Sequence, residues 1–94
     1  YSTAMGLSTT ASGEASTAMG RLTTASGIGS FASGYSTTAS GHQSISAGNS
    51  SNASASYSTS IGYGSVASDF ASTVIGQYNS SGSSVTNNAT SFST

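Results

Sequence analysis

Glycine recurs every seven residues along most of this chain. The members of the series are Gly6, Gly13, Gly20, Gly27, Gly34, Gly41, Gly48, Gly62 and Gly76. The two missed slots hold Ala55 and Asp69. We letter the seven positions a to g, with glycine at f, so that eleven heptads run from Tyr1 to Gln77. A fixed period is typical of repeat architectures, in which each unit contacts only its neighbours.

A heptad period first suggests a coiled coil, but the residue types argue against one. A coiled coil needs large apolar side chains at two positions of each heptad, whereas here position d is nearly always Ala and position b is always Ser or Thr. Glycine in a helix interior also costs about 1 kcal/mol relative to alanine. The pattern instead predicts a short strand over positions b to e, ended by a turn at the glycine.

Alternate heptads differ, so the structural repeat is fourteen residues long. At position e every even heptad carries Ser, whereas the odd heptads carry Met, Ile, Ala or Ser. Two heptads therefore form one coil with two unlike strands, and the coils stack into an all-β, parallel β-solenoid. About five and a half coils fit into residues 1–77. Residues 78–94 lose the regular Gly and Ala slots, and we expect an irregular cap, the start of a neck or a frayed tail there.

Strand alternation assigns positions b and d to one face and positions c and e to the other. Because b and d hold almost only small side chains, we expect them inside a flattened roll, with their hydroxyl groups bonded along the stack or to the backbone. The reverse arrangement, with c and e inside, stays open. On the even strands, positions c and e form a candidate outward ladder of binding residues: Thr10, Ser12, Thr24, Ser26, Thr38 and Ser40.

The odd strands present a partly apolar face at positions c and e. An interior of Ser and Ala buries little apolar area, so the roll is marginally stable alone. Wrapping the apolar face around a symmetry axis would supply the missing core. The candidate residues of this oligomer interface are Met5, Met19, Phe31, Ile45, Ile61 and Ile75.

The composition argues against several partners and against catalysis. Charged residues make up 3% of the chain and the net charge is −1, so no basic patch exists for nucleic acid and no cationic amphipathic segment for a membrane surface. The single histidine, His42, lies at a turn position with no Cys, Asp or second His at metal-ligand spacing. Neither a catalytic triad nor a phosphate-binding loop is recognisable. We therefore expect no enzyme activity, no metal and no cofactor.

Three further features of the sequence are a charged pair, a pair of tyrosines and a set of sequons. Glu14 and Arg21 fall on opposite corners, which favours an ion pair between chains over one within a chain. Tyr35 and Tyr63 share a corner, where they serve as binding anchors or pack over glycines. The N-x-S/T sequons at positions 49, 52, 79 and 88 are interpreted as ordinary turn asparagines, because they are expected by chance in a chain rich in Ser and Thr.

The repeated phrases resemble the YadA-like head repeats of trimeric autotransporter adhesins. These phrases are S-T-A-M-G at Ser2–Gly6 and Ser16–Gly20, S-T-S-I-G at Ser58–Gly62 and S-T-V-I-G at Ser72–Gly76, alternating with T-T-A-S-G. The resemblance implies a left-handed parallel β-roll that assembles as a homotrimer on an extracellular surface fibre and attaches to host or matrix surfaces. Similar repeats also occur in phage tail fibres and in large secreted proteins, which makes a virion fibre a second location.

Two other functions fit the same pattern. The Thr-x-Ser ladder resembles the threonine arrays of ice-binding β-solenoids, although Asn52 and Val66 interrupt it. The low charge and the absence of Pro also permit a structural fibril, in which rolls stack end to end.

Overall fold

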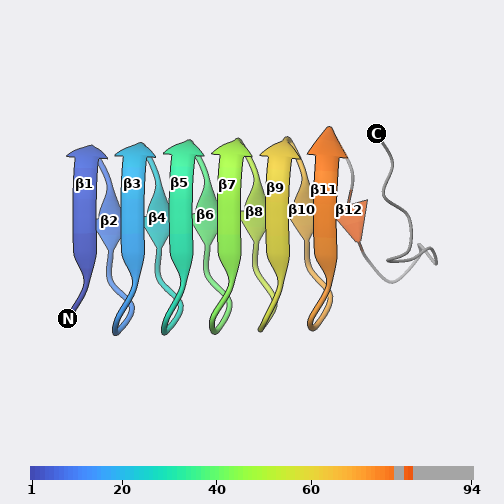
Figure 1. Ribbon diagram of the computed structural model, residues 1–94, viewed down its shortest axis with the longest axis horizontal. Helices are drawn as coiled ribbons and strands as arrows, with labels where there is room; N and C mark the ends of the chain where they lie inside the picture. The colour runs from blue at the N-terminus through green and yellow to red at the C-terminus, as the bar shows by residue number, and fades with distance from the viewer. Residues whose placement is uncertain (78–79, 82–94) are drawn as a thin grey trace.

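Each fourteen-residue unit contributes one long and one short strand to a solenoid of two parallel sheets. The computed structural model describes residues 1–77 and 80–81 (Figure 1). The long strands are β1 (Thr3–Leu7), β3 (Thr17–Arg21), β5 (Phe31–Tyr35), β7 (Ile45–Asn49), β9 (Thr59–Tyr63) and β11 (Thr73–Gln77). The short strands are β2 (Thr10–Ala11), β4 (Thr24–Ala25), β6 (Thr38–Ala39), β8 (Asn52–Ala53), β10 (Val66–Ala67) and β12 (Ser80–Ser81).

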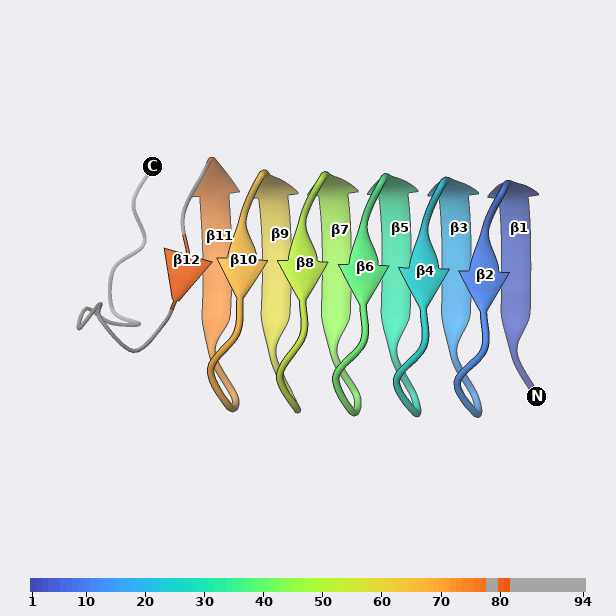
Figure 2. The ribbon, with the colours of Figure 1, turned by 180° about the vertical axis from the view of Figure 1, so that it is seen from behind.

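Strand pairing confirms the fourteen-residue repeat. One sheet has the order β1-β3-β5-β7-β9-β11 and the other β12-β10-β8-β6-β4-β2. The short strands lie behind the long strands in Figure 1 and in front of them in Figure 2. Every pair is parallel with an offset of fourteen, as in Met5 opposite Met19. Equivalent positions of successive coils therefore stack into columns. The second sheet continues through β12 to Ser81, past the expected end of the roll at Gln77; the cap, neck or tail expected over 78–94 otherwise lies outside the described residues.

Small side chains fill the interior, as positions b and d predict. Ala residues at position d from Ala18 to Ala67 are fully buried, and so are the Ser and Thr residues at position b from Ser16 to Ser65. The reverse arrangement, with c and e inside, is wrong. The chain closes into a roll because no large side chain separates the two sheets.

Among the described residues, the buried hydroxyl groups other than those of Thr23 and Ser30 bond within their own coil. Ser16 and Ser44 each donate to the carbonyl oxygen three residues earlier, that of Gly13 at 2.7 Å and that of Gly41 at 2.8 Å. Hydroxyl groups of Ser60 and Ser65 lie 2.8 Å apart across the two strands of one coil. Bonds to the backbone, one of the two expected arrangements, are thus observed for Ser16 and Ser44, whereas Ser60 and Ser65 bond to each other. Both kinds of contact satisfy groups that would be costly to bury alone.

Glycines of the odd heptads lie inside the long strands, so the turn predicted for Gly6, Gly20, Gly34, Gly48, Gly62 and Gly76 is wrong. Gly34, within β5, has a φ of 110°. A Cβ atom there would also collide with the carbonyl oxygen of Gly48 in the next coil. Glycine is needed here because stacked backbones approach closely in a conformation that side chains disfavour.

Glycines of the even heptads behave differently. Gly13, Gly27 and Gly41 lie at bends just after the short strands, as the turn prediction requires, and their φ angles are not positive. Both exceptions to the glycine series, Ala55 and Asp69, fall in this even set. A Cβ atom at Gly41 would also collide with a backbone carbonyl oxygen, that of Ala55, so the odd and even slots differ in their φ angle and not in how closely the backbones approach.

Position a, rather than position f, adopts the left-handed conformation. Its φ lies between 52° and 60° at Ser8, Ala15, Leu22, Ser36, Gln43, Ser50, Tyr57 and Ala71, and is 68° at Gly29 and Gly64. From Leu22 onward, each of these turns is held to the previous coil by a backbone bond, such as that from the Gln43 N–H to the Ile28 carbonyl at 2.7 Å. These bonds stabilise a conformation that costs about 1–2 kcal/mol per residue with a side chain.

Candidate functional site

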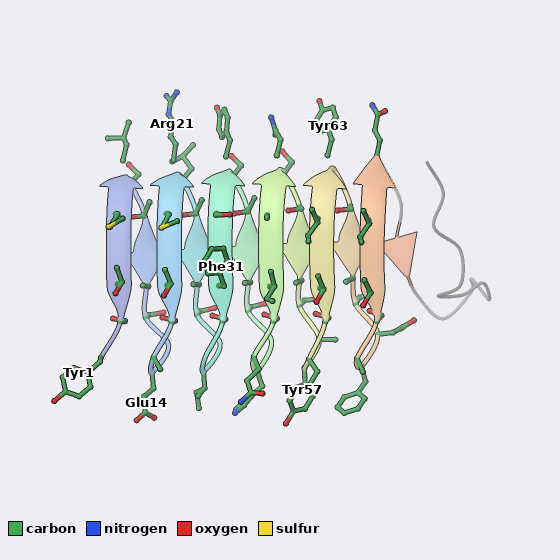
Figure 3. The ribbon with its side chains drawn as sticks, viewed as in Figure 1. Tyr1, Glu14, Arg21, Phe31, Tyr57 and Tyr63 are labelled. Atoms are coloured by element: carbon green, nitrogen blue, oxygen red, sulfur yellow. The ribbon has the colours of Figure 1, made fainter. Side chains whose placement is uncertain are left out.

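The outward face of the long-strand sheet carries most of the exposed aliphatic side chains. Met5, Ile45, Ile61 and Ile75 are between 37% and 54% exposed, while Met19 and Phe31 are half-buried. Phe31 projects from the middle of this face (Figure 3). We call these six residues the apolar face. The structure thus brings all six candidate interface residues onto one sheet, where an extended apolar surface is typical of a contact site.

The opposite sheet presents the hydroxyl ladder. Thr10, Thr24 and Thr38 stack in one column, and the same column continues with Asn52 and Val66. The other three members of the ladder are exposed at position e: Ser12, Ser26 and Ser40. The structure therefore places the six ladder residues together, on the side of the roll away from the apolar face (Figure 2).

One edge of the roll lies at the carboxyl ends of the long strands. We call it the Arg21 edge, and it consists of the position g residues Leu7, Arg21, Tyr35, Asn49, Tyr63 and Gln77. Arg21 and Tyr63 both point outward there (Figure 3). The Arg21 guanidinium lies 5.4 Å from the centroid of the Tyr35 ring, a cation–π distance. This contact was not predicted from the sequence, although the offset of fourteen residues between Arg21 and Tyr35 indicates it.

The other edge consists of the turns that follow the short strands. We call it the Glu14 edge, with Glu14, Ile28, His42, Ser56 and Phe70 at position g and Tyr57 beside them. The Tyr57 and Phe70 rings meet edge to face, with centroids 5.5 Å apart and planes at 83°. Phe70 is nevertheless 71% exposed. This pair was not predicted from the sequence because its members lie at different heptad positions, a and g.

The charged and titratable groups do not assemble into a chemical site. Glu14 and Arg21 point away from opposite edges (Figure 3), so they form no ion pair within the chain. His42 is exposed on the Glu14 edge. Over residues 1–77 and 80–81, no three side chains of His, Cys, Asp or Glu gather where a metal would bind. The same residues contain no helix long and apolar enough to cross a membrane.

Comparison with known proteins identifies the repeat. A family model described as the YadA head domain repeat (2 copies) matches residues 1–23, 25–51, 39–65 and 53–79. The last three matches begin at intervals of fourteen residues, which is the spacing of the stacked coils. No curated protein and no solved structure matches the chain.

Proposed function

The chain belongs to the YadA head domain repeat family, and from that premise we propose that it is a non-enzymatic head module of an extracellular surface fibre. The module assembles as a homotrimer of left-handed rolls, and its outward hydroxyl ladder attaches to host or matrix surfaces. Family heads are structural adhesin repeats that form trimers and are exposed at the cell surface.

The proposal rests on the position of the apolar side chains. The described core is built from Ala, Ser and Thr with one Val, whereas Phe31 and the Met and Ile residues of the apolar face lie outside it. Burial of one large aliphatic or aromatic side chain contributes about 1.5–3 kcal/mol. Three copies around a common axis would bury these side chains against one another, and the roll would gain the apolar core that it lacks.

The ladder suits attachment better than the two other functions. In such a trimer the short-strand sheet faces outward and offers uncharged hydroxyl groups along the fibre. A flat threonine array for ice would need the column of Thr10, Thr24 and Thr38 to continue, and Asn52 and Val66 follow instead. End-to-end fibrils would leave the apolar face exposed to water, which makes the third function less favourable.

Light scattering and an attachment assay test the proposal together. We expect the purified chain to have three times its monomer mass, and to bind a plate coated with extracellular-matrix extract. Replacing Ser26 and Ser40 on the outward ladder by Lys should reduce plate binding without changing the mass. A chain that is monomeric at all concentrations would contradict the trimer. Binding that is unchanged in the ladder variant would contradict the assigned attachment surface.

A further inference from the structure

We propose that the two edges of the roll are complementary, so that the Arg21 edge of one copy docks against the Glu14 edge of the next. This inference rests on the proposed trimer and adds the contact that closes it. Arg21 of one copy then pairs with Glu14 of its neighbour, and Tyr63 of the same copy packs against the outer side of the contacting Tyr57 and Phe70 rings of that neighbour.

The symmetry of a closed ring brings unlike edges together. When the apolar face of each copy points toward an axis parallel to the roll, a rotation places one edge of a copy beside the other edge of the next copy. Such an interface is heterologous, because two different surfaces meet. A useful contact therefore requires residues on the Arg21 edge that suit those on the Glu14 edge at the same height along the roll.

The two charged residues meet this requirement. Successive coils are about 4.8 Å apart, and Arg21 follows Glu14 by half a coil, which places the two at heights about 2.4 Å apart on opposite edges. Arg21 carries the only side-chain positive charge apart from His42, and Glu14 is one of two carboxylates. Leu22 and Ile28 lie beside them on the same two edges and are both 45% exposed. Packing of these neighbours would exclude water from the ion pair and strengthen it.

The aromatic residues select one register between the edges. With the copies unshifted, the height of Tyr63 along the roll is six residues past the neighbour's Tyr57 and seven residues before its Phe70, so that Tyr63 faces both contacting rings within half a coil. If the neighbour were displaced by one coil toward the C-terminal end of the roll, its Glu14 would still lie within half a coil of Arg21. Its Phe70, however, would lie one and a half coils from Tyr63. Edge-to-face aromatic contacts prefer centroid distances of 4.5–7 Å. Only the unshifted register brings Tyr63 close enough to both Tyr57 and Phe70 of the neighbour for such contacts.

Cysteine pairs test the register directly, because the chain has no cysteine of its own. Glu14→Cys combined with Leu7→Cys places the thiols of neighbouring copies half a coil apart in the unshifted ring. A disulfide requires Cα atoms about 4.4–6.8 Å apart. We expect this double variant, when oxidised, to run as a covalent trimer on a non-reducing gel. The matched control, Glu14→Cys with Tyr35→Cys, places the thiols one and a half coils apart and should remain monomeric on the gel.

Charge reversal tests the ion pair. We expect Arg21→Glu and Glu14→Arg each to raise the dissociation constant of the trimer several-fold, and the double variant Arg21→Glu/Glu14→Arg to return it to within about twofold of the original value. Light scattering separates the two proposals: a chain that is always monomeric overturns the trimer. A trimer that crosslinks through the Tyr35 control, or whose charge reversals are not mutually compensating, overturns the edge contact and leaves the trimer standing.

Discussion

The hydroxyl group of Ser44 donates a hydrogen bond of 2.8 Å to the carbonyl oxygen of Gly41 inside the roll. Ser30 occupies the same position one coil earlier and is equally buried, yet its hydroxyl group has no partner among the described residues. The two serines therefore form a natural comparison of a satisfied and an unsatisfied buried hydroxyl group.

We expect Ser44→Ala to lower the free energy of unfolding by about 1 kcal/mol, because it removes a buried hydrogen bond. Ser30→Ala should be neutral or stabilising, since it removes only an unpaired polar atom from the interior. Urea denaturation at a single protein concentration measures both, with concentration fixed because association adds to apparent stability. Equal losses in the two variants would show that the hydroxyl groups are equivalent, contrary to the structure.

Substitution of glycine should depend on which heptad carries it. Gly34→Ala places a Cβ against the Gly48 carbonyl at a φ of 110°, and we expect a loss of more than 3 kcal/mol or failure to fold, combining strain with steric overlap. Gly41→Ala places a Cβ equally close to the Ala55 carbonyl but lacks the strain of a positive φ, so we expect it to cost less than Gly34→Ala. Circular dichroism during thermal unfolding compares the two. A larger loss at Gly41 than at Gly34 would contradict the distinction between odd and even slots.

Glycine at the left-handed turn position should stabilise the roll. Ala71 has a φ of 56°, so Ala71→Gly relieves about 1–2 kcal/mol of strain while adding about 0.5–1 kcal/mol of backbone entropy to the unfolded chain. We expect a net gain of about 0.5 kcal/mol in the free energy of unfolding. The matched control is Ala39→Gly, at a fully buried strand position, which should destabilise. Destabilisation by both variants to the same extent would contradict the assigned strain.

The repeat determines most of the fold from the sequence alone. A period of fourteen with small residues at b and d leads directly to parallel pairing at an offset of fourteen and to an Ala and Ser interior, and both are observed. The role of glycine was harder to infer. Close backbone approach and a sharp turn both select glycine, so Gly34 in a strand and Gly41 at a bend look identical in the sequence.

The contacts at the edges were only partly predictable. The opposite placement of Glu14 and Arg21 follows from counting residues, as does the stacking of Arg21 on Tyr35. The edge-to-face pair of Tyr57 and Phe70 depends instead on how a turn orients positions a and g. That orientation depends on the left-handed conformation of the residue at position a. Backbone bonds between coils stabilise this conformation, so no single residue type recurs at position a to indicate it in the sequence.

A charged side chain on the apolar face should prevent assembly of the trimer without unfolding the roll. In a trimer, the three copies of Ile61 converge toward the axis, so Ile61→Lys would bury like charges that lack partners, at a cost of several kcal/mol. We expect this variant to keep the strand signal of the folded roll by circular dichroism but to scatter light as a monomer. Ser54→Lys, which adds the same charge on the exposed outward sheet, is the control and should remain trimeric. If Ile61→Lys assembles as well as Ser54→Lys does, the apolar face does not form the interface.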